Sequence, residues 1–379
     1  MRRVVILPSL ALAALALSGL ACSSTKSGSG FTDGPPVVDS GKITDGTVPS
    51  GDTSFSNPPP SGDGGFGMQD LDTGPPDGSV TVATTIYAHT DTALYSMDPT
   101  TMAVTPVGLF SGLPDAAYQS VTDLAVNAAG DVYVCTESVV YKAALPSTPS
   151  ATASVPLTMV ATISATSTTY FYALAFTPAG VLGTGEMLVG GDSTGELWSI
   201  DPSSGATVDL GNFGTDAQNT GYTYGVSGDL VFYMNAMNQP TGLATIRSCK
   251  TGTSTCYPSS ESSDFLAGIN MTALAAAYTS KTKATTLLGG IYGGSMTSPG
   301  NGTTLQKIFG LGAWQGNVYG FTRASTGSSA QPPKFVSIST TTGVASVIDS
   351  NFSFTDGWSG AGVTTTVTIV LPPPPQVAQ

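Results

Sequence analysis

The chain has 379 residues and a formal net charge of −13, with only 10% charged residues beside 46 glycines and 26 prolines. A chain so poor in Lys and Glu lacks the residues that helices expose to solvent, so the composition excludes helical bundles and coiled coils. The acidic balance argues against nucleic acid as a partner, and a single histidine excludes a metal centre built from several histidines.

The chain begins with the pattern of an export signal. A basic start at Arg2 and Arg3 precedes an apolar run over residues 4–17 and a few small residues. This run is shorter than the ~20 residues that span a bilayer, and no second long apolar run follows. We therefore assign residues 1–21 to a signal peptide and expect membrane contact only through a lipid anchor.

The end of the signal, LSGLACSS, resembles the lipobox of bacterial lipoproteins. The resemblance implies that Cys22 becomes the lipidated first residue, held at the outer membrane or the cell surface. Gly19 departs from the motif, which favours Leu, Val or Ile at that place. The alternative is ordinary signal-peptidase cleavage with Gly19 and Ala21 as the small residues, which would give a periplasmic or secreted protein.

Two further segments have the composition of disordered chain. Residues 22–79 are dominated by Gly, Pro, Ser, Thr and Asp, and so few large apolar residues cannot offset the entropy cost of folding. Their Asp-Gly pairs lack the ligand spacing and terminal Glu of a calcium-binding loop, so we predict a flexible tether. Residues 371–379, which include four consecutive prolines, are predicted to be a disordered tail.

Residues 80–370 repeat with a period of about fifty residues. Apolar triplets recur in this register, at Leu124 (LAV), Leu174 (LAF), Tyr224 (YGV) and Leu274 (LAA). A longer motif begins at Leu94 (LYSMDPTTMAVTPVGLF) and returns at Leu197 (LWSIDPSSGATVDLGNF) and, more weakly, at Phe335. A turn followed by a strand also recurs, as GDVYV, GDLVF and GNVYG.

Each repeat has the pattern of four antiparallel strands joined by tight turns, because Asp, Pro, Ser and Gly occupy the places between apolar segments. Four strands in a period of 40 to 50 residues are typical of a β-propeller. We predict an all-β fold with six blades, leaving seven open. Blade starts are expected near Tyr118, Tyr170, Tyr222, Met271 and Trp314. The sixth blade is split, with residues 357–370 adding a strand to a blade begun at Ser79.

The segments TDLAVNAAGDVYVCT and LWSIDPSSG resemble repeats of the NHL-type, TolB-like and gluconolactonase-like six-bladed propellers, over about residues 80–370. The resemblance implies a ligand or partner site on one face, around the central channel. Gluconolactonase-like enzymes bind a divalent metal through acidic and Asn side chains, but those ligands do not map onto this sequence. We therefore assign no metal site and no cofactor, although a divalent metal stays open.

The search for catalytic residues leaves none assigned. His89 in IYAHTDTALY, near Asp91, could be a general base or a metal ligand, but a surface residue of a strand is the better interpretation. GDSTG around Ser193 matches the serine-hydrolase motif, yet strands flank it on both sides where that motif needs a strand and then a helix. Cys135 lies in a strand and is interpreted as a buried small hydrophobe.

Two other residue sets carry structural or binding predictions. Cys249 and Cys256 enclose a short polar turn, which a disulfide would close in an exported protein. Polar aromatic or amide side chains recur near the expected blade entrances, at Tyr118, Tyr170, Tyr222, Asn270, Trp314 and Trp358. They form either a ligand-binding ring around one channel mouth or the packing between blades. The acidity of the domain argues against anionic ligands.

From these features we expect an exported, lipid-anchored monomer that acts as a binding module at the cell envelope rather than as an enzyme. The expected partner is an envelope protein or a glycan. Two alternatives stay open, a metal-dependent propeller hydrolase or lactonase and a structural component of the envelope. Fold by itself does not decide among them.

Overall fold

The computed structural model describes residues 85–113, 120–163, 170–192, 194–235, 237–251, 256–257, 264–295, 305, 307–324, 331–354 and 357–366. The predicted signal peptide, tether and tail lie outside these residues, as do Cys22, Tyr118 and Ser193. Within the described ranges, no helix has the length and apolar character needed to cross a bilayer.

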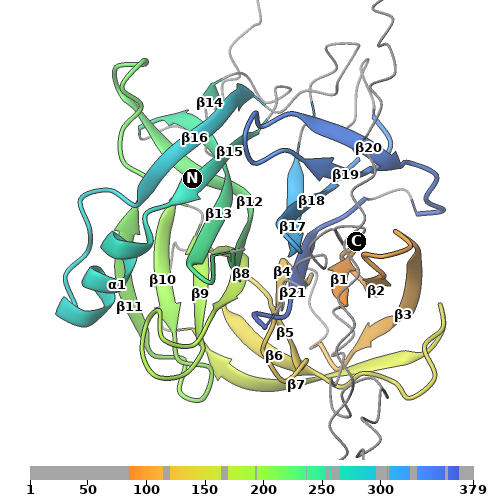
Figure 1. Ribbon diagram of the computed structural model, residues 1–379. Coiled ribbons are helices and arrows are strands. Elements are labelled where there is room, and N and C mark those ends of the chain that lie inside the picture. Colours follow the sequence, from red (N-terminus) through yellow and green to blue (C-terminus); the bar gives the residue numbers. More distant parts are fainter. Residues whose placement is uncertain are drawn as a thin grey trace, which may run out of the picture. The chain divides into compact units, whose positions relative to one another are not determined.

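The described strands form five blades of four antiparallel strands, named here blades I to V, of which blades I and II belong to one eight-stranded sheet (Figure 1). Blade I contains, from its inner to its outer edge, β21 (Gly360–Val363), β1 (Ile86–His89), β2 (Ala93–Met97) and β3 (Val104–Ser111). Blade II contains β4 (Asp123–Val126), β5 (Val132–Cys135), β6 (Val139–Ala143) and β7 (Ser154–Thr162). Blade III contains β8 (Phe171–Thr177), β9 (Met187–Asp192), β10 (Glu196–Ile200) and β11 (Thr207–Asn212).

The two remaining blades lie in the C-terminal half of the chain. Blade IV contains β12 (Tyr222–Met234), β13 (Pro240–Lys250), β15 (Phe265–Ile269) and β16 (Leu288–Ser295), with the short β14 (Cys256–Tyr257) beside β13. Blade V contains β17 (Ile308–Trp314), β18 (Asn317–Thr322), β19 (Phe335–Ile338) and β20 (Ala345–Asp349). A helix, α1 (Met271–Ser280), lies between β15 and β16.

The inner strands of the blades make a closed ring. β4 contacts β8, β8 contacts β12, β12 contacts β17, β17 contacts β21, and β21 returns to β4. Sheets arranged radially around such a ring are a β-propeller, so the predicted fold class is confirmed. The described strands make five blades, however, where the repeat period predicts six.

The predicted split blade is confirmed. The last described strand, β21, pairs antiparallel with β1, so that Val363 lies opposite Ile86 and Gly360 lies opposite His89. The two ends of the domain therefore share one sheet, and their pairing covers the edges that each would otherwise expose. Blade I is also joined to blade II at its outer edge, where β3 and β7 pair in parallel.

The predicted hairpins form where the Asp-Pro turns occur. Asp98 follows β2 and accepts a hydrogen bond from the backbone N–H of Thr100 at 2.8 Å. Asp201 follows β10 and accepts the equivalent bond from Ser203 at 2.8 Å. Side-chain acceptors of this kind hold the chain reversal in place of a backbone partner, which explains why the motif repeats at the same point of two blades.

The predicted blade start at Met271 is wrong, because this segment is α1. Its N-terminus is capped by Asn270, whose side chain accepts a hydrogen bond from the N–H of Ala273 at 3.0 Å. Ala-rich sequence favours helix, and Leu274 and Ala277 are the buried positions of this one. The LAA triplet thus resembles the strand triplets in sequence without being a strand, and β15 and β16 complete blade IV instead.

Two further expectations need correction. The Gly-Asp pair of GDLVF does not turn the chain, because β12 runs through it with a bulge between Val226 and Leu230. A bulge inserts extra residues while the strand continues. Trp314 ends β17 rather than opening a blade.

Small residues allow the inner strands to approach each other. A Cβ atom added to Gly310 in β17 would lie 2.8 Å from the Cβ of Ala361 in β21. A Cβ added to Gly362 would lie 2.6 Å from Cδ1 of Leu124 in β4. The backbone spacing around the channel therefore depends on glycine at these positions, as expected for strands that converge at the centre of a propeller.

Gly360 gives a test of this packing. A Cβ atom there would meet both Asp123 Oδ1 and His89 Nε2 at less than 3.0 Å, whereas Gly185 has no atom within 4 Å and no left-handed backbone. We expect Gly360→Ala to lower the free energy of unfolding by about 3 kcal/mol, measured by urea denaturation. Gly185→Ala is the matched control and should change it little. Equal stability of the two variants would contradict the close packing described here.

Candidate functional site

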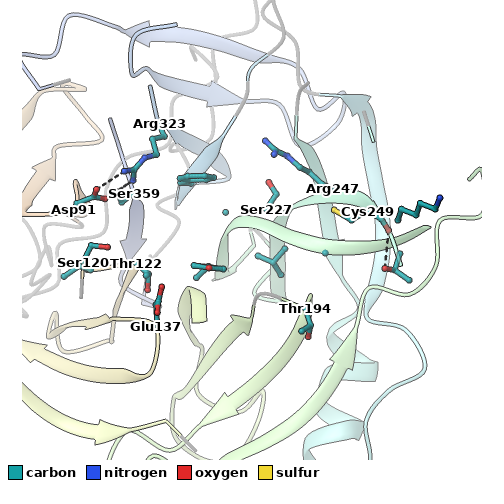
Figure 2. A pocket seen from close by; sticks show the side chains of 18 of the residues that line it. Asp91, Ser120, Thr122, Glu137, Thr194, Ser227, Arg247, Cys249, Arg323 and Ser359 are labelled. Carbon is teal, nitrogen blue, oxygen red and sulfur yellow. Dashed lines mark hydrogen bonds and ion pairs between the residues drawn. The ribbon is translucent and has the colours of Figure 1, made fainter. Parts of the chain in front are cut away.

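A cavity of about 850 Å³ lies at one end of the ring of inner strands. All five inner strands contribute to it at or just before their N-terminal ends. The contributing residues are Thr122 before β4, Tyr172 in β8, Thr223 in β12, Phe309 in β17 and Ser359 before β21. The cavity is thus centred on the mouth of the channel, where each blade can supply a side chain (Figure 2).

The lining combines hydroxyl groups with an exposed aromatic ring. The hydroxyl groups belong to Ser120, Thr122, Thr194, Thr223, Thr251, Ser227 and Ser359. Tyr172 lies at the start of β8 and is 42% exposed. An aromatic face beside many hydrogen-bonding groups is suited to a polar ligand that also has an apolar face.

One side of the cavity holds a closed charged network. Both Nη nitrogens of Arg323 donate to the carboxylate oxygens of Asp91 at 2.8 Å. Ser359 donates to Asp91 at 2.5 Å and accepts from Arg323 at 2.8 Å. The hydrogen bonds from Arg323 hold the pKa of Asp91 below its usual range, so this carboxylate stays ionised. These groups join the loop after β1, the end of β18 and the start of β21.

The opposite side of the cavity holds a second arginine in a different arrangement. Arg247 of β13 donates from Nε to Asp264 Oδ1 at 2.6 Å. The other carboxylate oxygen of Asp264 accepts from the backbone N–H of Ile308 at 2.7 Å. The Nη2 atom of Arg247 is buried and has no hydrogen-bond partner among the described residues. This arginine therefore has donors to spare, although its side chain is only 16% exposed.

Two buried aspartates tie the inner strands together behind the cavity. Asp123 of β4 accepts from the backbone N–H of Leu174 in β8 at 2.6 Å. Asp229 of β12 accepts from the backbone N–H of Leu311 in β17 at 2.5 Å. Each aspartate also accepts from the N–H of the residue that follows it. Both carboxyl groups therefore act as structural cross-links between neighbouring blades.

These two carboxyl groups lie close enough for each to affect the titration of the other. Burial is the main cause that raises the pKa of Asp229, to about 8. Burial and the nearby charge of Asp229 raise the pKa of Asp123 well above its usual value. A carboxyl pair in such a site keeps a proton at pH values where an exposed pair would have lost both.

His89 is a strand residue, as predicted, but it is buried rather than at the surface. Its Nδ1 atom lies 2.8 Å from the carbonyl oxygen of Thr90, which makes Nδ1 the protonated nitrogen. Burial lowers the pKa of His89 to about 4, so the ring is neutral at physiological pH. Its Nε2 atom has no hydrogen-bond partner in the described part of the chain, and the residue does not line the cavity.

The described residues contain no group of three or more His, Cys, Asp or Glu side chains placed to hold a metal ion. The carboxylate oxygens of Asp123 and Asp229 already accept backbone N–H groups.

The cysteines follow their predicted roles as far as they are described. Cys135 is a free thiol with no exposed surface, and burial raises its pKa to about 12, which makes it an unreactive nucleophile. Cys249 is disulfide-bonded, and the register of β13 and β14 sets the backbone of Cys256 opposite it. This register is the one that the predicted Cys249–Cys256 bridge requires.

The structure disperses the described members of the predicted binding ring, and none of them is among the residues that line the cavity. Tyr170 is 42% exposed and Tyr222 is half-buried. Asn270 caps α1, and Trp314 packs against the core at the end of β17. Trp358 is fully buried. It packs edge-on against Tyr95, Phe321 and Phe354, the inter-blade packing that was the alternative.

The predicted ring and the cavity lie near the same ends of the inner strands, but their side chains differ. Tyr172, Thr223 and Ser359 lie one or two residues beyond the predicted Tyr170, Tyr222 and Trp358. For Thr223 in β12 the offset is one residue, and adjacent residues of a strand point to opposite faces; the offset of two residues between Tyr170 and Tyr172 is not explained by this alternation. The sequence analysis did not single out the two arginines of the cavity. Their rarity was an available signal, because the domain has only two arginines.

No protein-family model and no curated protein matches the chain. Similar solved structures include a protein of unknown function from Bacteroides caccae, with 8% identity, a TM-score of 0.36 and coverage of 74% of this chain and 98% of that one. A virginiamycin B lyase from Staphylococcus aureus has 10% identity, a TM-score of 0.35 and coverage of 73% and 84%. The Dos1 propeller has 12% identity, a TM-score of 0.30 and coverage of 72% of this chain and 55% of its own.

The raised pKa values of Asp123 and Asp229 predict a pH dependence of stability. In the unfolded chain both groups ionise near pH 4, while in the folded protein the pKa of Asp229 is about 8 and that of Asp123 is well above its usual value. The folded state therefore binds more protons than the unfolded state above pH 4, and the free energy of unfolding contributed by this pair falls as pH rises towards 8.

Urea denaturation between pH 5 and 8 measures this effect. Asp123→Asn removes one of the titrating groups. The decrease of the free energy of unfolding with rising pH should then become shallower by up to about 1.4 kcal/mol per pH unit. Asp98→Asn is the control, because Asp98 is exposed and the backbone hydrogen bond from Thr100 lowers its pKa out of this range. An unchanged slope in Asp123→Asn would show that the buried pair is ionised in the folded protein.

Proposed function

We propose that this protein is an exported, lipid-anchored glycan-binding module of the cell envelope, with its ligand in the cavity at the channel mouth. The observation that carries the proposal is the cavity itself, which has a volume of about 850 Å³ and is lined by residues at the ends of all five inner strands. Its volume falls in the range of ligand sites in other proteins, ~300–1,000 Å³.

The chemistry of the lining supports a sugar in particular. Carboxylate, guanidinium and hydroxyl groups from Asp91, Glu137, Arg323 and several Ser and Thr residues offer donors and acceptors to ligand hydroxyls. Tyr172 offers an exposed ring on which the apolar face of a sugar can lie. The ion pair between Arg323 and Asp91 also holds both side chains in place, which lowers the entropy cost of binding.

Variants of two neighbouring tyrosines distinguish binding in the cavity from binding at the ring expected from the sequence. Tyr172 lines the cavity and Tyr170 does not, yet both are 42% exposed. Glycan-array binding, followed by calorimetry on the best ligand, should show that Tyr172→Ala weakens binding by about tenfold, or ~1.4 kcal/mol.

Tyr170→Ala is the matched control and should bind as the unaltered protein does. The reverse result, with Tyr170→Ala weakened and Tyr172→Ala unaffected, would move the site to the ring expected from the sequence. If no glycan binds but an envelope protein is captured, the ligand is a protein segment instead.

The lipid anchor is tested separately at Cys22. Cys22→Ser removes the thiol that the lipobox-like sequence places at the start of the mature chain. We expect the variant to appear in the soluble fraction after export, whereas the unaltered protein fractionates with membranes, because lipid chains supply the membrane affinity. Retention of the variant in membranes would contradict a lipid anchor at this residue.

A further inference from the structure

Three of the eight basic residues of the domain line the cavity. Arginine occurs in the chain at positions 2, 3, 247 and 323, and the two that belong to the domain both line the cavity. Lys250 lines it as well. The lining also contains Asp91 and Glu137, so the channel mouth holds charges of both signs, and a ligand there responds mainly to charges within a Debye length, ~10 Å at 0.1 M salt.

The two arginines differ in what they leave available. Arg323 donates from both Nη nitrogens to Asp91, so its charge is matched by a carboxylate in the bidentate geometry. Arg247 meets Asp264 through Nε alone. The oxygens of Asp264 bind Nε of Arg247 and the N–H of Ile308, and Nη2 finds no acceptor among the described residues.

The unpartnered Nη2 atom of Arg247 is energetically unfavourable as it stands. A buried donor without an acceptor costs ~1–3 kcal/mol, more for a charged group. Ser227 also lies next to Asp264, and its Oγ is buried without a hydrogen bond of ordinary geometry. Figure 2 shows Arg247 and Ser227 together, on the side of the cavity away from Asp91, Arg323 and Ser359.

We propose that Arg247 and Ser227 form a subsite for the oxyanion of an acidic sugar, a carboxylate or a sulfate ester, within the glycan-binding cavity. This inference rests on the proposed function and names its ligand class. Oxyanion atoms accept hydrogen bonds from guanidinium N–H groups, and bonds between charged partners are about twice as strong as neutral ones. The cavity lining holds Arg247, Lys250 and Arg323 beside the carboxylates of Asp91 and Glu137, so the overall acidity of the domain is not repeated in the groups nearest such a ligand.

The test uses the exported chain, residues 22–379 with Cys22→Ser, in which Arg247 and Arg323 are the only arginines. Side-chain Nε–H signals of arginine in a ¹⁵N–¹H spectrum then number two, and Arg323→Lys assigns them. The probes are glucuronate, glucose 6-sulfate, glucose and acetate. We expect the Arg247 signal to shift with either acidic sugar, at an affinity at least tenfold above that for glucose, and the tighter of the two identifies the oxyanion.

Two variants make the result specific to the subsite. Arg247→Gln/Asp264→Asn removes the ion pair together and leaves the net charge unchanged, so neither an unpaired buried charge nor general electrostatics can explain its effect. It should lose the tenfold preference for acidic sugars. Glu196→Gln/Lys283→Gln removes another ion pair, whose residues do not line the cavity, and should keep the preference.

The failure of this inference differs from the failure of the proposed function. If glucose and glucuronate bind equally, and Tyr172→Ala weakens both, the cavity binds glycans but the oxyanion subsite is overturned. If acetate shifts the Arg247 signal while no sugar does, the glycan function is overturned and the site binds another acid. If the double variant at Arg247 keeps its preference for acidic sugars, the subsite is overturned whichever sugar binds.

Discussion

The structure depends on the pairing of β21 with β1. Strands from the two ends of the domain share blade I, with Ile86 opposite Val363, and only this pairing brings β21 between β17 and β4. The ring of inner strands is then closed, and no blade is left with an open inner neighbour. Because the strands converge on one axis, their side chains must be small, or, where they are polar, must form hydrogen bonds within the protein. Gly310, Gly360 and Gly362 meet the first requirement.

The second requirement is met by the carboxyl groups of Asp123 and Asp229, which bind backbone N–H groups of the next blade. A polar group buried beside an axis is tolerated only when its hydrogen bonds are made. These aspartates therefore belong to the scaffold, and the cavity above them is free to differ in chemistry. The same geometry explains why residues from every blade line the cavity, since the N-terminal ends of all inner strands lie at one mouth of the channel.

The charged groups at the cavity differ from what the net charge of the chain suggests. The chain as a whole is acidic, yet its buried carboxyl groups carry a proton or bind backbone N–H groups, while both arginines of the domain face the channel mouth. One arginine is matched by Asp91 and one has donors left over. On one side of the cavity the charge of Arg323 is therefore matched by Asp91. On the other side Arg247 can bind a negative ligand, although the net charge of the chain argues against such a ligand.

The sequence by itself determined the local structure of this protein. Hairpins at Asp98 and Asp201 and the buried Cys135 follow from turn residues and strand periodicity, which act over a few residues and can be recognised in one segment, while the split blade follows from the register of the repeats. Local patterns do not show that the Leu274 triplet is helical, that the described strands make five blades, or that Arg247 and Ser227 both lie next to Asp264. Those features depend on which segments pack together across the ring. Only the tertiary structure decided them, because contacts between distant strands and the burial that they impose leave no local pattern.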